Sequence, residues 1–230
     1  KELFRNDSYL KTCSSKIIEI LDEGLVLDNN VFYPEGGGQP GDVGNIKYDN
    51  KTFEIINTKY IDKKIVLCLE STAGFNLNQE MICEINWTRR FSIMQVHTCL
   101  HLLCSIIKAP VTGGQISEGK GRLDFDLESK PDKEFVIENI NKLIKGNFDV
   151  KVSSITEEEL DKNPELVRTM AVQPPRGSGS IRMISIGQDI DYQPCGGTHV
   201  KNTSEINLVT KVKVENKGRM NKRVVLELNN

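Results

Sequence analysis

The chain has 230 residues, of which 38% are hydrophobic and 27% charged, and its formal net charge is −2. This size and apolar content suit one large or two small globular domains with a buried core. The near-neutral charge gives no global field of the kind that marks many nucleic-acid-binding proteins. No run of eighteen apolar residues occurs and the start, KELFRNDSYLK, has no apolar core, so we expect neither a membrane span nor a secretion signal.

The cysteines do not have the dense, regular spacing of a disulfide framework. Together with the missing secretion signal, this predicts free and mostly buried thiols in a protein of the reducing cytoplasm. The six cysteines are Cys13, Cys68, Cys83, Cys99, Cys104 and Cys195.

Short runs rich in β-branched residues, broken by Gly, Asn and Asp, fill residues 16–86 and predict β-strands. The run KYDNKTFEI predicts a hairpin with a two-residue turn at Asp49-Asn50. These strands predict a small β-barrel or sandwich, and we expect a small N-terminal β-barrel domain over residues 1–88.

The pattern changes after Trp87, where residues 88–108 show apolar residues at the three- and four-residue steps of a helix. Thr88 is the expected N-cap, and Pro110 is expected to end the run. A second helix is predicted over residues 131–145, stopping at Gly146.

Further elements follow towards the C-terminus. A strand is expected over 151–155, and the Thr-x-x-Glu capping signal at Thr156 predicts a short helix over 156–163. Another strand is expected at 180–186, and a closing hairpin is expected around Lys217-Gly218. The predicted class is α+β, with an α/β domain of helices on an antiparallel sheet over residues 89–230.

Residues 211–223, KVKVENKGRMNKR, hold six basic residues and one acid. Such a segment is either the solvated face of a hairpin or a contact for a polyanion. The basic residues are Lys211, Lys213, Lys217, Arg219, Lys222 and Arg223.

All three histidines fall into metal-ligand spacing. His97 and His101 lie four residues apart, so on a helix both rings project from one face. His199 follows Cys195 by four residues in PCGGTH. Each pair alone is a weak signal, but two imidazoles with a thiolate and a third imidazole form a tetrahedral zinc set. The ligand types do not distinguish a structural from a catalytic metal.

These two motifs, with FYPEGGGQPGD at 32–42 upstream, resemble the editing domain of alanyl-tRNA synthetase. They are still more similar to the free-standing trans-editing proteins of that family, called AlaX. The segments RLDFDLE (122–128) and 182–206 resemble the family as well. The related editing domain of threonyl-tRNA synthetases shares the metal motifs, but FYPEGGGQ favours the alanyl branch.

The resemblance implies a zinc-dependent deacylase that hydrolyses serine or glycine from mischarged alanine tRNA. It implies that His97, His101, Cys195 and His199 bind the metal and take part in catalysis. Because His199 sits on a flexible loop, we take it as the candidate for a looser ligand or for a proton-transfer role. Thr98 inside the HTxxH motif is expected to form part of the pocket that recognises the serine hydroxyl; the simpler explanation is a threonine bonded to its own helix backbone. Further candidates for the pocket are Gly37, Gly38, Gln39, Gln115 and Arg122.

The basic residues of 211–223 are the candidates for tRNA contact, and Arg89 and Arg90 are candidates for reaching the acceptor end. Helix-start arginines are, however, more often solvent-exposed. Four alternatives remain open: an excised synthetase fragment, a non-catalytic zinc-stabilised tRNA-binding module, threonyl-type editing, and a metalloprotease. The last ranks low because HTCLH lacks the glutamate of HExxH.

The segment FYPEGGGQPGD also admits three interpretations. It lacks a GKS/T ending and a GxGxxG pattern, which argues against a phosphate loop. A catalytic Gly-Gly-Gln, as in peptide release factors, is not needed if the metal site performs the hydrolysis. We therefore expect a glycine-built turn of the β-domain beside the pocket.

Overall fold

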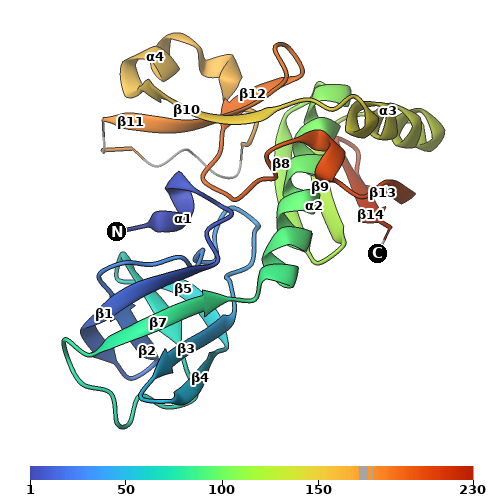
Figure 1. Ribbon diagram of the computed structural model, residues 1–230. Helices are drawn as coiled ribbons and strands as arrows, with labels where there is room; N and C mark the ends of the chain where they lie inside the picture. Colours follow the sequence, from blue (N-terminus) through green and yellow to red (C-terminus); the bar gives the residue numbers. More distant parts are fainter. Residues whose placement is uncertain (171–175, 178, 230) are drawn as a thin grey trace. The chain divides into compact units, whose positions relative to one another are not determined.

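The computed structural model describes residues 1–170, 176–177 and 179–229, and it divides into two compact units, Lys1–Phe91 and Ser92–Asn230 (Figure 1). We call them unit 1 and unit 2. Among the described residues, no helix is both long enough and apolar enough to cross a membrane.

Unit 1 is a curled antiparallel sheet with a short helix, α1 (Leu3–Asn6), at its start. The hydrogen-bonded strand order is β4-β3-β7-β1-β2-β6-β5. The strands are β1 (Thr12–Leu21), β2 (Gly24–Leu27), β3 (Gly44–Tyr48), β4 (Lys51–Ile55), β5 (Asn57–Ile61), β6 (Lys64–Cys68) and β7 (Glu80–Ile85).

The curl arises in β1, whose first half pairs with β7 and whose second half pairs with β2. A break in register between Ile17 and Glu19 leaves Ile18 exposed, as a β-bulge does when it bends a strand. The predicted strands and the turn at Asp49-Asn50, where both residues have positive φ, are confirmed. The pairing ladder ends at β4 and β5, so the predicted barrel is not confirmed.

The Gly-rich segment forms a tight turn within unit 1. Gly36 and Gln39 exchange both backbone hydrogen bonds at 3.0 Å, and Gly37 and Gly38 between them have φ of 59° and 82°. Two consecutive positive φ angles define the type I′ turn that glycine enters without steric cost. At Gly41, an added Cβ would lie 2.0 Å from the carbonyl oxygen of Thr58, so only glycine fits there.

Asp42 ties this segment to the first turn of helix α2 (Trp87–Ile106). Its carboxylate accepts hydrogen bonds from the guanidinium of Arg90 and, at 2.6 Å, from the backbone nitrogen of Tyr33. The Arg90 side chain is fully buried, and Arg89 donates to the carbonyl of Gly41 at 2.7 Å. Contrary to the expectation from the sequence, Arg90 is therefore neither solvent-exposed nor able to reach tRNA, because its guanidinium is buried and paired with the Asp42 carboxylate.

Unit 2 is α+β, as predicted, but it holds two antiparallel sheets where the sequence suggested one. The first has the order β10-β11-β12 and the second has the order β13-β14-β9-β8. Besides the main part of α2, its elements are β8 (Val111–Ser117), β9 (Lys120–Asp126), α3 (Lys133–Lys145), β10 (Val150–Thr156), α4 (Glu157–Lys162), η1 (Pro164–Leu166), β11 (Ser180–Ile186), β12 (Asp191–Pro194), η2 (Thr203–Glu205), β13 (Val209–Gly218) and β14 (Asn221–Leu228).

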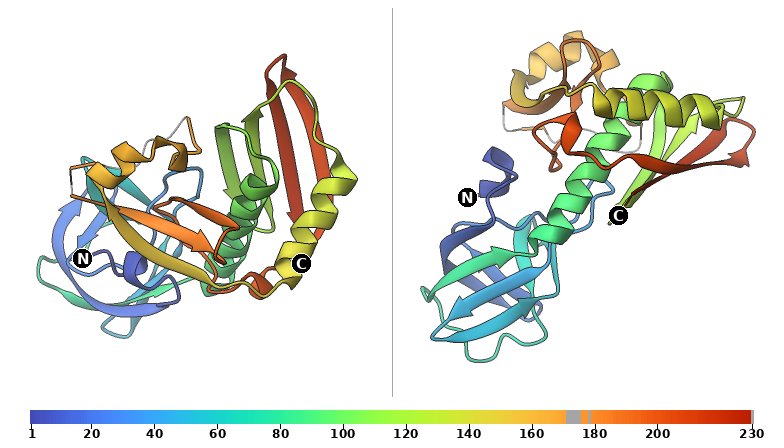
Figure 2. Two further views of the ribbon diagram at one scale, coloured as in Figure 1. Left: turned by 90° about the horizontal axis from the view of Figure 1, so that it is seen from above. Right: turned by 45° about the vertical axis from the view of Figure 1, so that its right-hand side comes forward.

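Helix α2 packs against β9 at a position where only glycine fits. A Cβ on Gly121 would lie 2.6 Å from a methyl of Val96 and 3.1 Å from a methyl of Leu100. The face of α2 that carries Val96 and Leu100 therefore packs against the four-stranded sheet. Helix α3 runs along β13, where the Asn141 side chain exchanges hydrogen bonds with the backbone of Val209 (Figure 2).

Local signals mostly located the helix ends correctly. Thr156 forms the predicted capping box with Glu159. The predicted N-cap of α2 is wrong by two residues: the helix begins at Trp87, and the Asn86 side chain accepts from the backbone nitrogen of Arg89 at 3.1 Å. The turn of the closing hairpin is also displaced, since Gly218 pairs with Asn221. The six cysteines are all free, and four of them are buried.

Candidate metal centre

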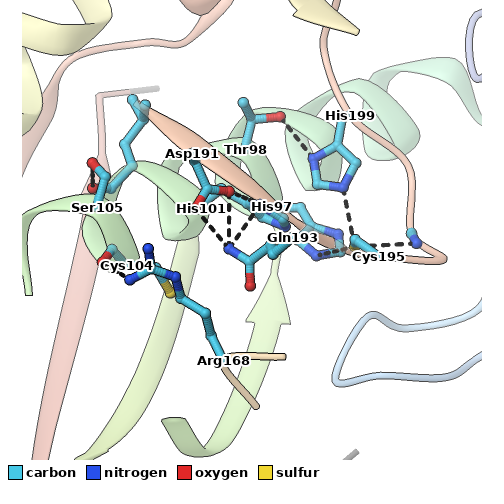
Figure 3. A network of polar contacts seen from close by, with 12 residues as sticks. His97, Thr98, His101, Cys104, Ser105, Arg168, Asp191, Gln193, Cys195 and His199 are labelled. Carbon is cyan, nitrogen blue, oxygen red and sulfur yellow. Dashed lines mark hydrogen bonds and ion pairs between the residues drawn. The ribbon is translucent and has the colours of Figure 1, made fainter. Parts of the chain in front are cut away.

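Four side chains from two distant segments meet in unit 2. His97 and His101 project from one face of α2, and Cys195 and His199 lie on the loop that follows β12 (Figure 3). The ligand atoms of the four residues all lie within 4.8 Å of one another. The rings of the three histidines are buried, and Cys195 is partly buried.

The spacing of these atoms suits a tetrahedral metal ion. Cys195 Sγ lies 3.5 Å from His97 Nε2 and 3.3 Å from His199 Nε2. Zinc binds nitrogen at about 2.0–2.1 Å and sulfur at about 2.3 Å, so a tetrahedral site separates such ligand atoms by roughly 3.5 Å. These two distances fit the geometry of a tetrahedral metal site, and the group of four could hold such an ion.

Electrostatics favour the thiolate at Cys195. Burial of the thiol acts against ionisation, but electrostatic interactions with the His97 and His199 imidazoles and a hydrogen bond from His101 outweigh it and lower the pKa of Cys195 well below its usual value. The thiolate is the form of cysteine that binds metals.

The pKa values of His199 and His101 shift in opposite directions. Burial and the neighbouring His97 lower the pKa of His199 well below its usual value, which favours a neutral ring. Burial acts against protonation of His101 as well, but hydrogen bonds to Asp191 and Cys195 raise its pKa to about 10. Metal binding needs neutral imidazole, so it would displace a proton from His101.

Asp191 and Gln193 both contact Nδ1 of the His101 ring. Asp191 Oδ2 lies 2.7 Å from His101 Nδ1, and Gln193 Nε2 lies 3.0 and 2.9 Å from the two Asp191 oxygens. The sequence reading missed both residues. The available signal was the alternation of β12, where Asp191 and Gln193 share one face directly before Cys195.

Thr98 holds the ring of His199 from α2. Its hydroxyl lies 2.9 Å from the Met94 carbonyl, 3.2 Å from His199 Nδ1 and 3.2 Å from the Val200 nitrogen, and the residue is fully buried. A hydroxyl has one donor and two acceptor positions, so these contacts use its whole capacity. In this conformation no position remains for a substrate hydroxyl, and the simpler explanation, a bond to the helix backbone, is part of what Thr98 does.

The loop that carries Cys195 and His199 is anchored at its backbone as well. Arg182 donates to the carbonyls of Cys195 and Gly197 at 2.6 and 3.0 Å, and the Gly197 nitrogen lies 3.4 Å from Cys195 Sγ. These contacts hold the loop in place, so loop flexibility does not support a looser role for His199.

The other predicted pocket residues belong to different elements. Gln115 and Arg122 pair across β8 and β9, and Arg122 also donates to Asp124 at 2.9 Å. They are on the sheet face opposite to Gly121, which packs on α2, so the structure does not bring them to the ligand group. Gly37, Gly38 and the buried Gln39 belong to the turn of unit 1.

Most of the basic residues predicted to contact tRNA have carboxylate neighbours. Lys211 pairs with Glu227, Lys213 and Lys217 pair with Glu215, and Arg223 pairs with Asp124. The Lys222 ammonium is an exception, because it is buried and donates to the carbonyls of Gly218 and Arg219. Lys222 therefore stabilises the hairpin turn and has no free surface for a phosphate.

Two family models match parts of the chain. The model described as "Threonyl and Alanyl tRNA synthetase second additional domain" matches residues 181–225, which include Cys195 and His199. The model described as "tRNA synthetases class II (A)" matches residues 7–89.

Curated proteins match over almost the whole length. The chain is 33% identical to the alanyl-tRNA editing protein AlaX-M of Saccharolobus solfataricus, covering 97% of both chains. It is 31% identical to the AlaX-M protein of Methanosarcina acetivorans, covering 98% of both. The alanine–tRNA ligase of Pyrobaculum aerophilum is 33% identical over 94% of this chain, which spans only 25% of that ligase. On this identity and coverage, the chain belongs to the family of AlaX-M alanyl-tRNA editing proteins.

Proposed function

We propose that this protein hydrolyses the ester that joins a wrong amino acid, serine or glycine, to alanine tRNA. It acts in trans, as an aminoacyl-tRNA deacylase of the cytoplasm that proofreads translation. The observation that carries the proposal is the convergence of His97, His101, Cys195 and His199 in a chain that matches editing proteins from end to end. Residues 89–230 form the deacylase domain, and residues 1–88 form a separate small β-domain.

The donor set supports zinc as the metal. Three imidazoles and a thiolate are the ligands that zinc prefers, and the sulfur–nitrogen distances fit its tetrahedral geometry. A bound zinc ion supplies a Lewis acid that polarises a carbonyl oxygen or acidifies a water molecule. The four side chains hold that ion, while Thr98 and Asp191 hold the rings of His199 and His101 in place.

Recognition of serine needs a polar group that pairs with its hydroxyl. A site that hydrogen-bonds a substrate hydroxyl rejects the analogue lacking it by about 10⁴-fold or more. The Thr98 hydroxyl is fully used in this conformation, and Gln115 and Arg122 lie on the sheet face opposite to α2, so another polar group must supply this contact. For the tRNA backbone we propose Lys211, Lys213, Lys217, Arg219 and Arg223, since phosphate contacts dominate such binding.

Two alternatives fit the same geometry. The chain matches a quarter of an alanine–tRNA ligase, so an editing domain that works inside a larger synthetase is one of them. The other is a zinc-stabilised tRNA-binding module without turnover, because a site with four protein ligands is more often structural.

The deciding experiment follows deacylation of Ser-, Gly- and Ala-charged alanine tRNA, and of Ser-charged threonine tRNA, by the zinc-loaded protein. We expect rapid hydrolysis of the Ser ester, little hydrolysis of the Ala ester, and loss of activity in Cys195→Ala. Circular dichroism after chelation is the control: a folded, inactive protein supports a catalytic metal, and unfolding supports the binding module. Equal hydrolysis of Ser and Ala esters, or none by the loaded protein, would contradict the proposal.

A further inference from the structure

The Asp191 carboxyl group is buried beside a candidate metal ligand, His101. Its side chain is 0% exposed and that of His101 is 7% exposed. Removing an ionised carboxylate from water costs several kcal/mol unless it is paired and hydrogen-bonded. The partners of Asp191 are His101 Nδ1 at 2.7 Å and both contacts from Gln193 Nε2.

The chemistry of these groups determines where the imidazole proton lies. A carboxylate only accepts hydrogen bonds, so the 2.7 Å contact requires a proton on His101 Nδ1. The Gln193 amide nitrogen only donates, so its 3.2 Å approach to the same Nδ1 is not a second hydrogen bond. With Nδ1 protonated, the neutral ring presents the lone pair of Nε2 on its opposite side, towards Cys195.

Strand β12 explains why both residues are held there. Asp191 pairs with Ile186 and Gln193 pairs with Ile184 in the β11–β12 hairpin, so the two side chains share one face. Tyr192 between them points to the other face and is 38% exposed. Cys195 lies directly after this strand. One short segment therefore carries both a candidate metal ligand and the groups that contact another, His101.

We propose that Asp191, itself fixed by Gln193, is a positioning residue that holds His101 in the tautomer and orientation needed for metal binding. Mutation of a group that hydrogen-bonds to a metal ligand typically changes metal affinity by about 10–100-fold. The inference rests on the metal site of the proposed function, but not on the identity of the substrate, because its test measures metal binding.

The test measures zinc affinity of the full chain by competition with a chromophoric chelator. Asp191→Asn is expected to lower affinity about 10–100-fold, and Gln193→Met is expected to lower it less. Tyr192→Phe, on the opposite face of the same strand, is the matched control and is expected to bind zinc as the wild type does. Nitrogen NMR of the zinc-loaded wild type should show the His101 proton on Nδ1.

A merely structural role gives a different result. In that case Asp191→Asn lowers the thermal stability of the chelated protein, while the folded fraction binds zinc within about twofold of the wild type. That outcome, or a proton on His101 Nε2 in the loaded wild type, overturns the proposal. If Asp191→Asn fails to fold, Gln193→Met decides: an affinity equal to that of Tyr192→Phe contradicts the inference. Failure of the wild type itself to bind zinc would instead refute the metal site.

Discussion

The Thr98 hydroxyl binds His199 Nδ1 and the Val200 nitrogen, so it connects helix α2 to the ligand loop. We expect Thr98→Val to lower zinc affinity about tenfold, because His199 loses the partner that orients it. It should also lower stability by about 1–3 kcal/mol, because the Val200 nitrogen is left buried without an acceptor. Chelator competition and thermal unfolding measure the two effects, and Thr98→Ser, which keeps the hydroxyl, is the control. A changed ratio of Ser to Ala deacylation with unchanged zinc affinity would restore a pocket role.

Arg90 is a second residue with a structural role that its position in the sequence hides. Arg90→Met leaves Asp42 as a buried carboxylate without its cation, so we expect a loss of about 3–5 kcal/mol. Urea unfolding followed by fluorescence of Trp87, the only tryptophan, measures unit 1 directly. Arg5→Met, which breaks a part-exposed pair with Glu2, should cost less than about 1 kcal/mol. Equal losses of stability in the two variants would contradict this role of the buried Arg90–Asp42 pair.

At the scale of elements, the Gly-rich turn makes separate demands at separate glycines. Gly37→Ala should cost about 1–2 kcal/mol because of its positive φ, and Gly37→Asn should cost less. Gly41→Ala should cost about 1–3 kcal/mol, because its Cβ collides with the Thr58 carbonyl. Gly36→Ala, with nearest neighbours at 3.9 Å, is the control and should be nearly neutral. Trp87 fluorescence during urea unfolding again reports the result; a neutral Gly41→Ala would show that the loop can move aside.

The outer face of the four-stranded sheet contains a pH-dependent contact. Hydrogen bonds from Arg223 lower the pKa of Asp124 below its ordinary 3.8. A lowered folded-state pKa stabilises the fold above pH 3.8, and this contribution is lost as the pH falls through the folded-state pKa. Asp124→Asn should therefore destabilise the protein at pH 7, and its difference from the wild type should shrink at lower pH. Urea unfolding of the variant and the wild type at pH 7 and at the lower pH tests this. An equal difference in stability at the two pH values would contradict it.

At the scale of the whole molecule, the metal is expected to stabilise unit 2 selectively. Its ligands come from α2 and from the loop after β12, and an ion that binds only the folded state stabilises it by mass action. Hydrogen exchange with and without chelator should therefore differ around Cys195–His199 and the second half of α2. The strands of unit 1 serve as the internal control. Faster exchange over the entire chain after chelation would show that the metal supports both units.

Elements with strong local signals were predictable from the sequence. The strands predicted within residues 16–86, helix α2 and the capping box of α4 formed as expected, because their periodicity and caps act within a few residues. The four candidate metal ligands were also visible, since a helical spacing and a short loop fix each pair locally. The start of α2 and the turn of the closing hairpin were each displaced by about two residues, because local signals locate element ends only to within one or two residues.

Other features depended on contacts between distant segments. The sequence by itself determined the ligand types, the glycine turn and the family, because these reside in contiguous motifs. Only the tertiary structure decided that Asp191 lies behind His101, that Thr98 is fully hydrogen-bonded and that Arg90 is buried against Asp42. Each of these contacts joins residues roughly 50 to 100 positions apart, and the free energy of a buried charge depends on which partner the fold supplies.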